Sequence, residues 1–162
     1  MEEVIELRFK YSEKEYVSAY RKYFLAKKRA AFFIIIASGL IVAGIYFLLS
    51  SGDVALTVSF IATGAFLIGL LVTSSILLPR QRFRSDPRFK GEYLLRFSEN
   101  GIEFHTDDID AKVSWRIYNE ALETRDFFLL SDGGSTLSVI PKRAFANAAQ
   151  ELRFRQMLDA KV

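Results

Sequence analysis

The chain carries few residues of the types and spacing that catalysis or metal binding requires. It contains one histidine, His105, and no cysteine, so a thiol nucleophile, a disulfide and a cysteine-based zinc site are excluded. A lone histidine makes a poor metal site. The aspartate-rich turn at 107–110 lacks the glycine and distal glutamate of a calcium loop, and 133–134 lacks the Lys-Ser/Thr pair of a phosphate loop. We therefore expect no catalytic, metal-binding or cofactor-binding residues, and predict that the protein is not an enzyme.

The positively charged residues are the remaining candidates for a functional role. The net charge is only +3, and the basic residues crowd both sides of an apolar block rather than covering a folded domain. A nucleic-acid-binding domain usually carries its basic residues on its own surface, so we expect no nucleic-acid partner. Nothing in the sequence indicates a small-molecule substrate. The residues that we predict to contact lipid headgroups or a partner are Arg80, Arg82, Arg84, Arg88, Lys90, Lys142 and Arg143.

The apolar block consists of two runs, 30–50 and 54–78, that predict a transmembrane hairpin. Each run is uncharged and long enough to cross a hydrocarbon core, which needs about 20 helical residues. Residues 51–53 leave room only for a tight turn. Basic residues flank the hairpin on both sides while the turn holds only Asp53, so the positive-inside rule places both termini in the cytoplasm. The first run is too long for a signal peptide, and the absence of ionisable residues argues against a transporter.

Small residues recur one turn apart in both runs, at Gly39 with Ala43 and at Ala65 with Gly69. Such pairs let helix backbones approach closely in lipid. We expect them to pack the two helices of the hairpin against each other. Dimerisation through the same faces is the alternative.

Residues 1–29 predict a strand followed by an amphipathic helix. Ile5, Leu7 and Phe9 alternate with charged residues, which is the period of a half-buried strand. Ser12 with Glu15 forms a capping-box pattern that starts a helix running into the first span. The aromatic residues of this helix suit either the membrane interface or packing on the C-terminal domain.

Residues 79–91 read as a basic juxtamembrane linker, and residues 92–162 as a small antiparallel β domain. The linker either binds anionic headgroups or only sets the topology. Apolar residues alternate from Tyr93, an Asn-Gly turn follows at 100–101, and Trp115 is expected in the core. Asn147 with Gln150 predicts the cap of a final helix, which carries Phe154, Met157 and Leu158 on one face.

The order of these features resembles the YcxB-like family of bacterial membrane proteins over nearly the whole chain. The resemblance rests on the hairpin, the linker ending at 86–91, the turn at 99–102, Trp115 before the apolar strand 127–130, and the stretch 140–145. It implies a pleckstrin-homology-like C-terminal domain closed by a helix, and a multi-pass protein of the bacterial inner membrane. It implies no catalytic motif. Where the family often has an acidic residue after the tryptophan, this chain has Arg116.

The expected fold class is therefore a membrane α+β protein with a two-helix transmembrane hairpin and a pleckstrin-homology-like β domain. The expected function is a membrane-anchored, non-enzymatic interaction module that binds a protein partner or a second copy of itself. The alternatives are an anionic-lipid sensor and an enzyme acting on membrane lipid or envelope precursors, which rests on location alone. For Lys142 and Arg143, the alternative to headgroup or acidic-peptide binding is surface charge that keeps the domain soluble.

Overall fold

A computed structural model describes residues 4–50, 52–86, 89, 91–106, 110–134 and 137–162. The chain forms two compact units. One, which we call the β unit, consists of Met1–Ala19 with Arg82–Val162, and the other, the apolar unit, consists of Tyr20–Gln81. The protein is thus an α+β chain with two long apolar helices, antiparallel sheets and a C-terminal helix.

The first sheet joins segments from both ends of the apolar block. It has the order β1-β2-β3-β4, where β1 is Ile5–Phe9, β2 is Tyr93–Ser98, β3 is Gly101–His105 and β4 is Asp110–Val113. β1 pairs antiparallel with β2, with Ile5 opposite Phe97 and Phe9 opposite Tyr93. The predicted alternation of the first strand is confirmed, since its three apolar residues are buried and the two between them are exposed.

The second sheet is formed by the C-terminal part of the chain alone. β5 (Glu120–Glu123), β6 (Phe127–Ser131) and β7 (Leu137–Pro141) make three antiparallel strands in that order. Every residue of the central strand β6 is buried. The predicted strand at 127–130 is therefore confirmed, whereas the edge strand β5 has no clear signal in the sequence. Only Leu122 of this strand is partly buried, so β5 lacks the repeated apolar residues by which a strand is recognised in a sequence.

One hydrophobic core unites the two sheets and the final helix. The helix α5, Ala148–Lys161, buries Phe154 and Leu158 against both sheets, and Met157 packs at the margin of the core. Trp115 is buried as expected, and its indole N–H donates to the carbonyl oxygen of Ser98 at 2.8 Å. This bond satisfies the polar atom that burial of a tryptophan would otherwise leave unpaired. The buried residues of the core are Ile5, Leu7, Phe9, Leu95, Phe97, Ile102, Trp115, Tyr118, Phe128, Leu130, Ile140, Phe154 and Leu158.

Both predicted helix caps are confirmed. The Ser12 hydroxyl accepts from the backbone N–H of Glu15 at 3.2 Å, and the Glu15 carboxylate accepts from the Ser12 N–H at 3.1 Å. This box opens α1, Glu13–Ala26. At α5, the Asn147 side chain accepts from the Gln150 N–H at 2.9 Å, and the Gln150 side chain accepts from the Ala146 N–H at 2.8 Å. Each cap satisfies backbone donors that a helix leaves free at its first turn.

The aromatic side chains of Tyr11, just before α1, and of Tyr16, on α1, pack within the β unit. The Tyr16 ring lies 4.5 Å from that of Phe89 and 5.7 Å from that of Phe83, measured between centroids. Tyr11 meets Tyr93 at 4.9 Å. Tyr16 is therefore buried among aromatic residues of the segment 79–91, and the two predicted settings of the helix aromatics, the membrane interface and the C-terminal domain, stay predictions.

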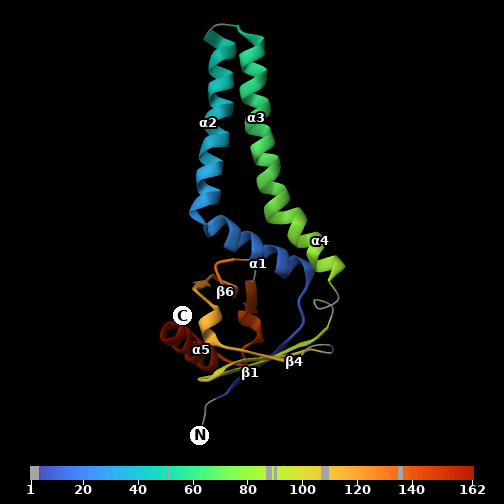
Figure 1. Cartoon of the computed structure of the whole chain (residues 1–162), viewed down its shortest axis with the longest axis vertical. Helices are drawn as coiled ribbons and strands as arrows, with labels where there is room; N and C mark the ends of the chain where they lie inside the picture. The colour runs from blue at the N-terminus through green and yellow to red at the C-terminus, as the bar shows by residue number, and fades with distance from the viewer. Residues whose placement is uncertain (1–3, 51, 87–88, 90, 107–109, 135–136) are drawn as a thin grey trace. The chain divides into compact units, whose positions relative to one another are not determined.

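The apolar unit is a pair of long antiparallel helices that lie side by side (Figure 1). α2 is Lys28–Ser50, and α3 is Val54–Val72. Asp53 caps α3, because its carboxylate accepts from the Leu56 N–H at 3.1 Å. Both helices are long and apolar enough to cross a membrane.

The second apolar helix continues beyond the predicted end at residue 78. A π-helical turn, Thr73–Leu77, leads into α4, Leu78–Ser85, so the first half of the expected linker 79–91 is helical. Pro79 has no N–H to donate and would crowd the carbonyl one turn earlier in a regular α-helix. The wider π-turn directly before it gives a physical reason for the continuation past a proline.

The expected pairing of small residues is wrong in its choice of positions. A Cβ placed on Gly39 or Gly69 would meet nothing within 4 Å. The close contacts are instead at Gly44, where a Cβ would lie 2.7 Å from Ile61 Cγ1, and at Gly64, where it would lie 2.9 Å from the Ala37 carbonyl oxygen. The buried small residues of the two helices recur every seven residues, which keeps them on one face: Ala30, Ala37 and Gly44 on α2, and Thr57 and Gly64 on α3.

Candidate functional site

Three of the predicted basic residues lie on α4 and are exposed. These are Arg80, Arg82 and Arg84. Arg84 is held by Glu13 of α1 through two bonds, Nε to Oε2 at 2.9 Å and Nη2 to Oε1 at 3.2 Å. This pairing raises the pKa of Arg84, chiefly through the hydrogen bond to Glu13. Arg88 and Lys90 lie outside the described residues.

Lys142 lies in a short 3₁₀ turn, Lys142–Ala144, that follows β7 directly. Its ammonium contacts two carboxylates, Glu123 of β5 at 2.5 Å and Glu151 of α5 at 3.0 Å. The side chain is only 17% exposed, and its ammonium also lies 4.8 Å from the centre of the Phe128 ring. Burial lowers the pKa of Lys142, but the bonds to the two carboxylates outweigh it and the net shift is upward.

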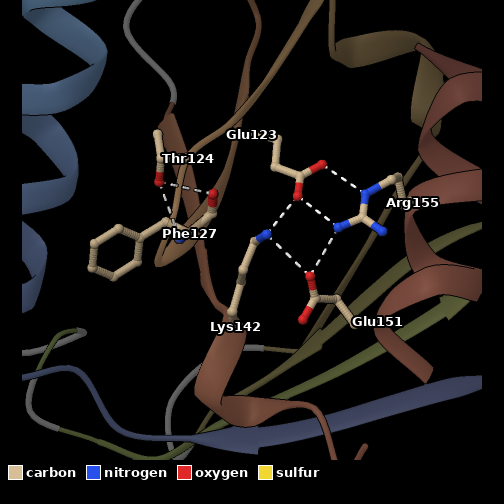
Figure 2. A network of polar contacts seen from close by, with 6 residues as sticks. All are labelled: Glu123, Thr124, Phe127, Lys142, Glu151 and Arg155. Atoms are coloured by element: carbon tan, nitrogen blue, oxygen red, sulfur yellow. Dashed lines mark hydrogen bonds and ion pairs between the residues drawn. The ribbon is translucent and has the colours of Figure 1, made fainter. Parts of the chain in front are cut away.

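Arg155 of α5 completes this polar cluster, which we define as Glu123, Lys142, Glu151 and Arg155 (Figure 2). Its guanidinium donates two hydrogen bonds to the Glu123 carboxylate, at 2.7 and 2.6 Å, and one to the Glu151 carboxylate at 2.9 Å. The hydrogen bonds from Arg155, followed by those from Lys142, hold the pKa of Glu123 at about 2 against the opposing effect of burial. Two cations thus balance two carboxylates, and the cluster ties β5, the end of β7 and α5 together.

Arg143 makes a second link, to the N-terminal part of the chain. Its Nε lies 2.5 Å from Glu15 Oε1, and its Nη2 lies 2.9 Å from Glu15 Oε2. The same Nη2 donates to the Lys10 carbonyl oxygen at 2.8 Å. The bond from Arg143 is the largest cause that lowers the pKa of Glu15 to about 2. Glu15 therefore caps α1 and anchors Arg143 at once.

These contacts change how the Lys142–Arg143 pair can act. Both cations already bind carboxylates of their own chain, so an outside anion would have to compete with Glu15, or with Glu123 and Glu151. Losing such a bond inside the protein costs free energy that the new ligand must exceed. Binding of a headgroup or partner by these two residues stays a prediction.

His105 lies at the end of β3, and its Nδ1 contacts the carboxylate of Asp110 at the start of β4. Within the described residues, no group of three or more histidine, aspartate or glutamate side chains is arranged to hold a metal ion. Asp107 and Asp108, the other members of the aspartate-rich turn, lie outside the described residues.

Sequence reasoning missed the carboxylate partners of the basic pair. Glu151 and Arg155 carry a local signal, because residues four apart on a helix are neighbours on its surface. Glu123 carries none, since its strand was not recognised and its partners lie 19 and 32 residues away. The Glu15–Arg143 pair spans 128 residues and leaves no local pattern at all.

The arrangement defines a class of protein: an antiparallel β domain with a pair of long apolar helices inserted in the sequence between its first two strands. Residues 97–158 match the family model described as YcxB-like protein. The match agrees with the family that the sequence resembles, and it begins within β2 rather than at the N-terminus. No curated protein and no solved structure matches the chain.

Proposed function

We propose that the protein is a membrane-anchored, non-enzymatic interaction module that presents a pleckstrin-homology-like domain at the cytoplasmic face. The observation that carries the proposal is the pairing of β1 with β2. In the sequence, β1 precedes the helical segments and β2 follows them. The chain therefore runs from the sheet into the apolar hairpin and returns to the same sheet. The domain is therefore tied to the hairpin by two chain connections, which suits a module held at a fixed place rather than one that diffuses.

The strand arrangement supports a pleckstrin-homology-like fold. Within the described residues, seven strands follow one another as a four-stranded and a three-stranded antiparallel sheet, and a C-terminal helix closes the core. A strongly bent sheet capped by a helix is what the family resemblance implies.

The surface of the hairpin supports insertion in a membrane. Large apolar side chains along both helices are exposed, among them Ile35 at 70%, Leu49 at 81% and Phe66 at 64%. Contiguous exposure of this kind is costly in water and favourable in lipid. Lys28 and Arg29 at one end of the hairpin, with Asp53 in the turn at the other, support a cytoplasmic position for both flanks.

The topology is testable by cysteine labelling, because the chain has no cysteine of its own. Single cysteines at Gly52 and Lys161 would be treated in intact cells with a membrane-impermeant maleimide. We expect rapid labelling at position 52 and labelling at position 161 only after permeabilisation. Labelling at both positions in intact cells, or at position 161 alone, contradicts the proposed orientation.

The interaction role is tested by photo-crosslinking in native membranes. Ile117 and Leu152 are the suitable positions, because both are large apolar side chains of the β unit and about half exposed. Replacement of either by a photoreactive residue should yield a reproducible crosslinked partner or a crosslinked dimer. Absence of both products at both positions refutes the module. Charge reversal at Lys142 or Arg143 is unsuitable here, because it breaks internal ion pairs.

The second candidate function is anionic-lipid sensing, favoured by the exposure of Arg80 and Arg82 on α4 directly after the apolar helices. Each basic residue near an anionic surface contributes about 1 kcal/mol. Native mass spectrometry of the full-length protein should then show retention of phosphatidylglycerol over phosphatidylcholine. The Arg80→Gln/Arg82→Gln variant should lose this preference, while Arg116→Gln/Lys161→Gln keeps it. An unchanged preference in the first variant refutes lipid sensing by α4.

A further inference from the structure

A cleft of about 530 Å³ opens within the β unit, between α1, the turn that joins β5 to β6, and the end of β7. Lys14 and Ser18 line it from α1, Arg125 and Phe127 from the turn, and Pro141 and Arg143 from the end of β7. Its volume lies in the range of sites for small molecules, about 300–1,000 Å³. The cleft adjoins the polar cluster: Lys142 belongs to both, whereas Glu123, Glu151 and Arg155 do not line the cleft.

The base of the cleft is apolar and held in place. Phe127 and Pro141 are both buried and face each other as a register pair of β6 and β7. The turn is fixed by bonds between its ends, of which the Thr124 N–H donates to the Phe127 carbonyl oxygen at 2.8 Å. The Thr124 hydroxyl donates to the same carbonyl oxygen at 3.0 Å and accepts from the Phe127 N–H at 3.1 Å (Figure 2). The backbone that carries Arg125 is therefore preorganised.

The rim of the cleft has an excess of positive charge. Figure 2 shows the Lys142 ammonium directed at Glu123 and Glu151, so its charge is balanced inside the polar cluster. The other charged lining residues are three cations and two carboxylates: Lys14, Arg125, Arg143, Glu15 and Asp126. Since Glu15 is bound by Arg143, the remaining charged residues of the rim are Lys14, Arg125 and Asp126, which together leave a net charge of +1.

Hydrogen-bond donors reach this rim from two different elements. Lys14 and Ser18 are four residues apart and so share one face of α1. Arg125 approaches from the β5–β6 turn with a guanidinium suited to phosphate oxygens. A phosphate group carries several strong acceptor oxygens in a tetrahedral arrangement, which suits donors that line a cleft from more than one side, whereas the two oxygens of a carboxylate lie in one plane.

We propose that this cleft binds a phosphate-bearing ligand, with Lys14 and Arg125 as its charge partners, Ser18 as a hydrogen-bond donor, and Phe127 with Pro141 against its apolar part. The phosphate can belong to a lipid headgroup or to a soluble molecule. The site goes beyond the proposed interaction role and requires no protein partner.

The test is calorimetry on the full-length protein in phosphatidylcholine nanodiscs. The probes are inorganic phosphate and dihexanoyl phosphatidic acid. The Lys14→Gln/Arg125→Gln variant should weaken binding at least tenfold. The matched control, Arg116→Gln/Lys161→Gln, removes the same charge outside the cleft from exposed positions and should stay within twofold of the parent. If the double variant does not fold, Arg125→Gln alone supplies the comparison.

The outcomes separate the ligand sources. Tighter binding of phosphatidic acid than of phosphate supports a lipid headgroup, and equal binding supports a soluble phosphate compound. No binding of either probe, or equal weakening in the control variant, overturns the proposal. Preference for an octaglutamate peptide over both phosphate probes also overturns it, because the cleft would then be a site for an acidic peptide.

Discussion

Arg143 and Glu15 form a two-bond pair, with Nε to Oε1 at 2.5 Å and Nη2 to Oε2 at 2.9 Å, between residues 128 positions apart. The pair joins the start of α1 to the turn after β7. A third bond, from Arg143 to the Lys10 carbonyl at 2.8 Å, reaches the segment between β1 and α1. The N-terminal segment is thus attached to the second sheet by side chains as well as to the first sheet by strand pairing.

This pair should be coupled energetically. A double-mutant cycle with Arg143→Gln and Glu15→Gln is expected to give a coupling free energy of about 1 kcal/mol, the upper end for exposed pairs, because the geometry is bidentate. Glutamine at position 15 preserves the capping box. Chemical denaturation, followed by fluorescence of the sole tryptophan, Trp115, measures it.

The Glu6–Arg96 pair is the control for this cycle. Its bond joins Arg96 Nε to Glu6 Oε2 at 2.9 Å, and both side chains are nearly half exposed, at 48% for Glu6 and 44% for Arg96. Its coupling free energy should stay below about 0.5 kcal/mol. Equal couplings for the two pairs would contradict a special role for Arg143.

Acid should destabilise the β unit in a defined window. The pKa values of Glu15 and Glu123 are lowered from 4.5 to about 2 in the folded protein. A lowered pKa means that the unfolded chain binds protons first as the pH falls. The stability contributed by both carboxylates is therefore full above about pH 4.5 and is lost progressively toward pH 2.

Denaturant midpoints of the full-length protein in detergent between pH 2 and pH 7 test this dependence. The Glu15→Gln/Glu123→Gln variant should show a shallower slope below pH 4.5 than the parent. A parent midpoint that is flat across the window would show that these ion pairs do not contribute to stability.

Helix packing in the apolar unit should tolerate a methyl group at one glycine and not at another. Gly64→Ala places a Cβ 2.8 Å from Ile41 Cγ1 and 2.9 Å from the Ala37 carbonyl oxygen. Overpacking of this kind typically costs about 1–3 kcal/mol. Gly69→Ala meets nothing within 4 Å, so it should be neutral or slightly stabilising because alanine favours a helix.

Unfolding of the two variants by sodium dodecyl sulfate in mixed micelles provides the measurement. Gly44→Ala should behave like Gly64→Ala, since its Cβ would lie 2.7 Å from Ile61 Cγ1 and 3.2 Å from the Thr57 carbonyl oxygen. If Gly69→Ala lowers the stability more than Gly64→Ala does, the helix face that carries Gly69 packs against another surface, and this result would support the dimerisation alternative.

The centre of the β unit should depend on Phe154. Its ring is fully buried and lies 4.7 Å from Phe97, 5.1 Å from Phe128 and 5.3 Å from Phe145. Phe154→Ala should cost about 3–5 kcal/mol through lost burial and a cavity. Leu152→Ala, two residues away and 49% exposed, should change the free energy of unfolding by less than about 0.5 kcal/mol. Thermal unfolding of both variants compares them directly, and similar losses would contradict the assigned core.

The sequence by itself determined the features that depend on neighbouring residues. The capping boxes at Ser12 and Asn147 were predicted because their partners lie three residues away. The strand alternation at Ile5–Phe9 follows from a period of two residues, and the two apolar helices follow from uncharged runs of about 20 residues or more. Burial of Trp115 followed from its size and apolarity.

The tertiary structure alone decided which distant segments meet. Nothing near Ile5 indicates that its strand pairs with a segment starting at Tyr93, beyond both apolar helices. The choice of Gly44 and Gly64 over Gly39 and Gly69 depends on which helix faces meet, and an i, i+4 pair alone does not specify a face. Lys142 and Arg143 were recognised as basic residues near a strand end, but their carboxylate partners come from β5, α5 and α1. Local patterns record what each segment prefers, whereas pairing across the chain is set by the packing of the whole core.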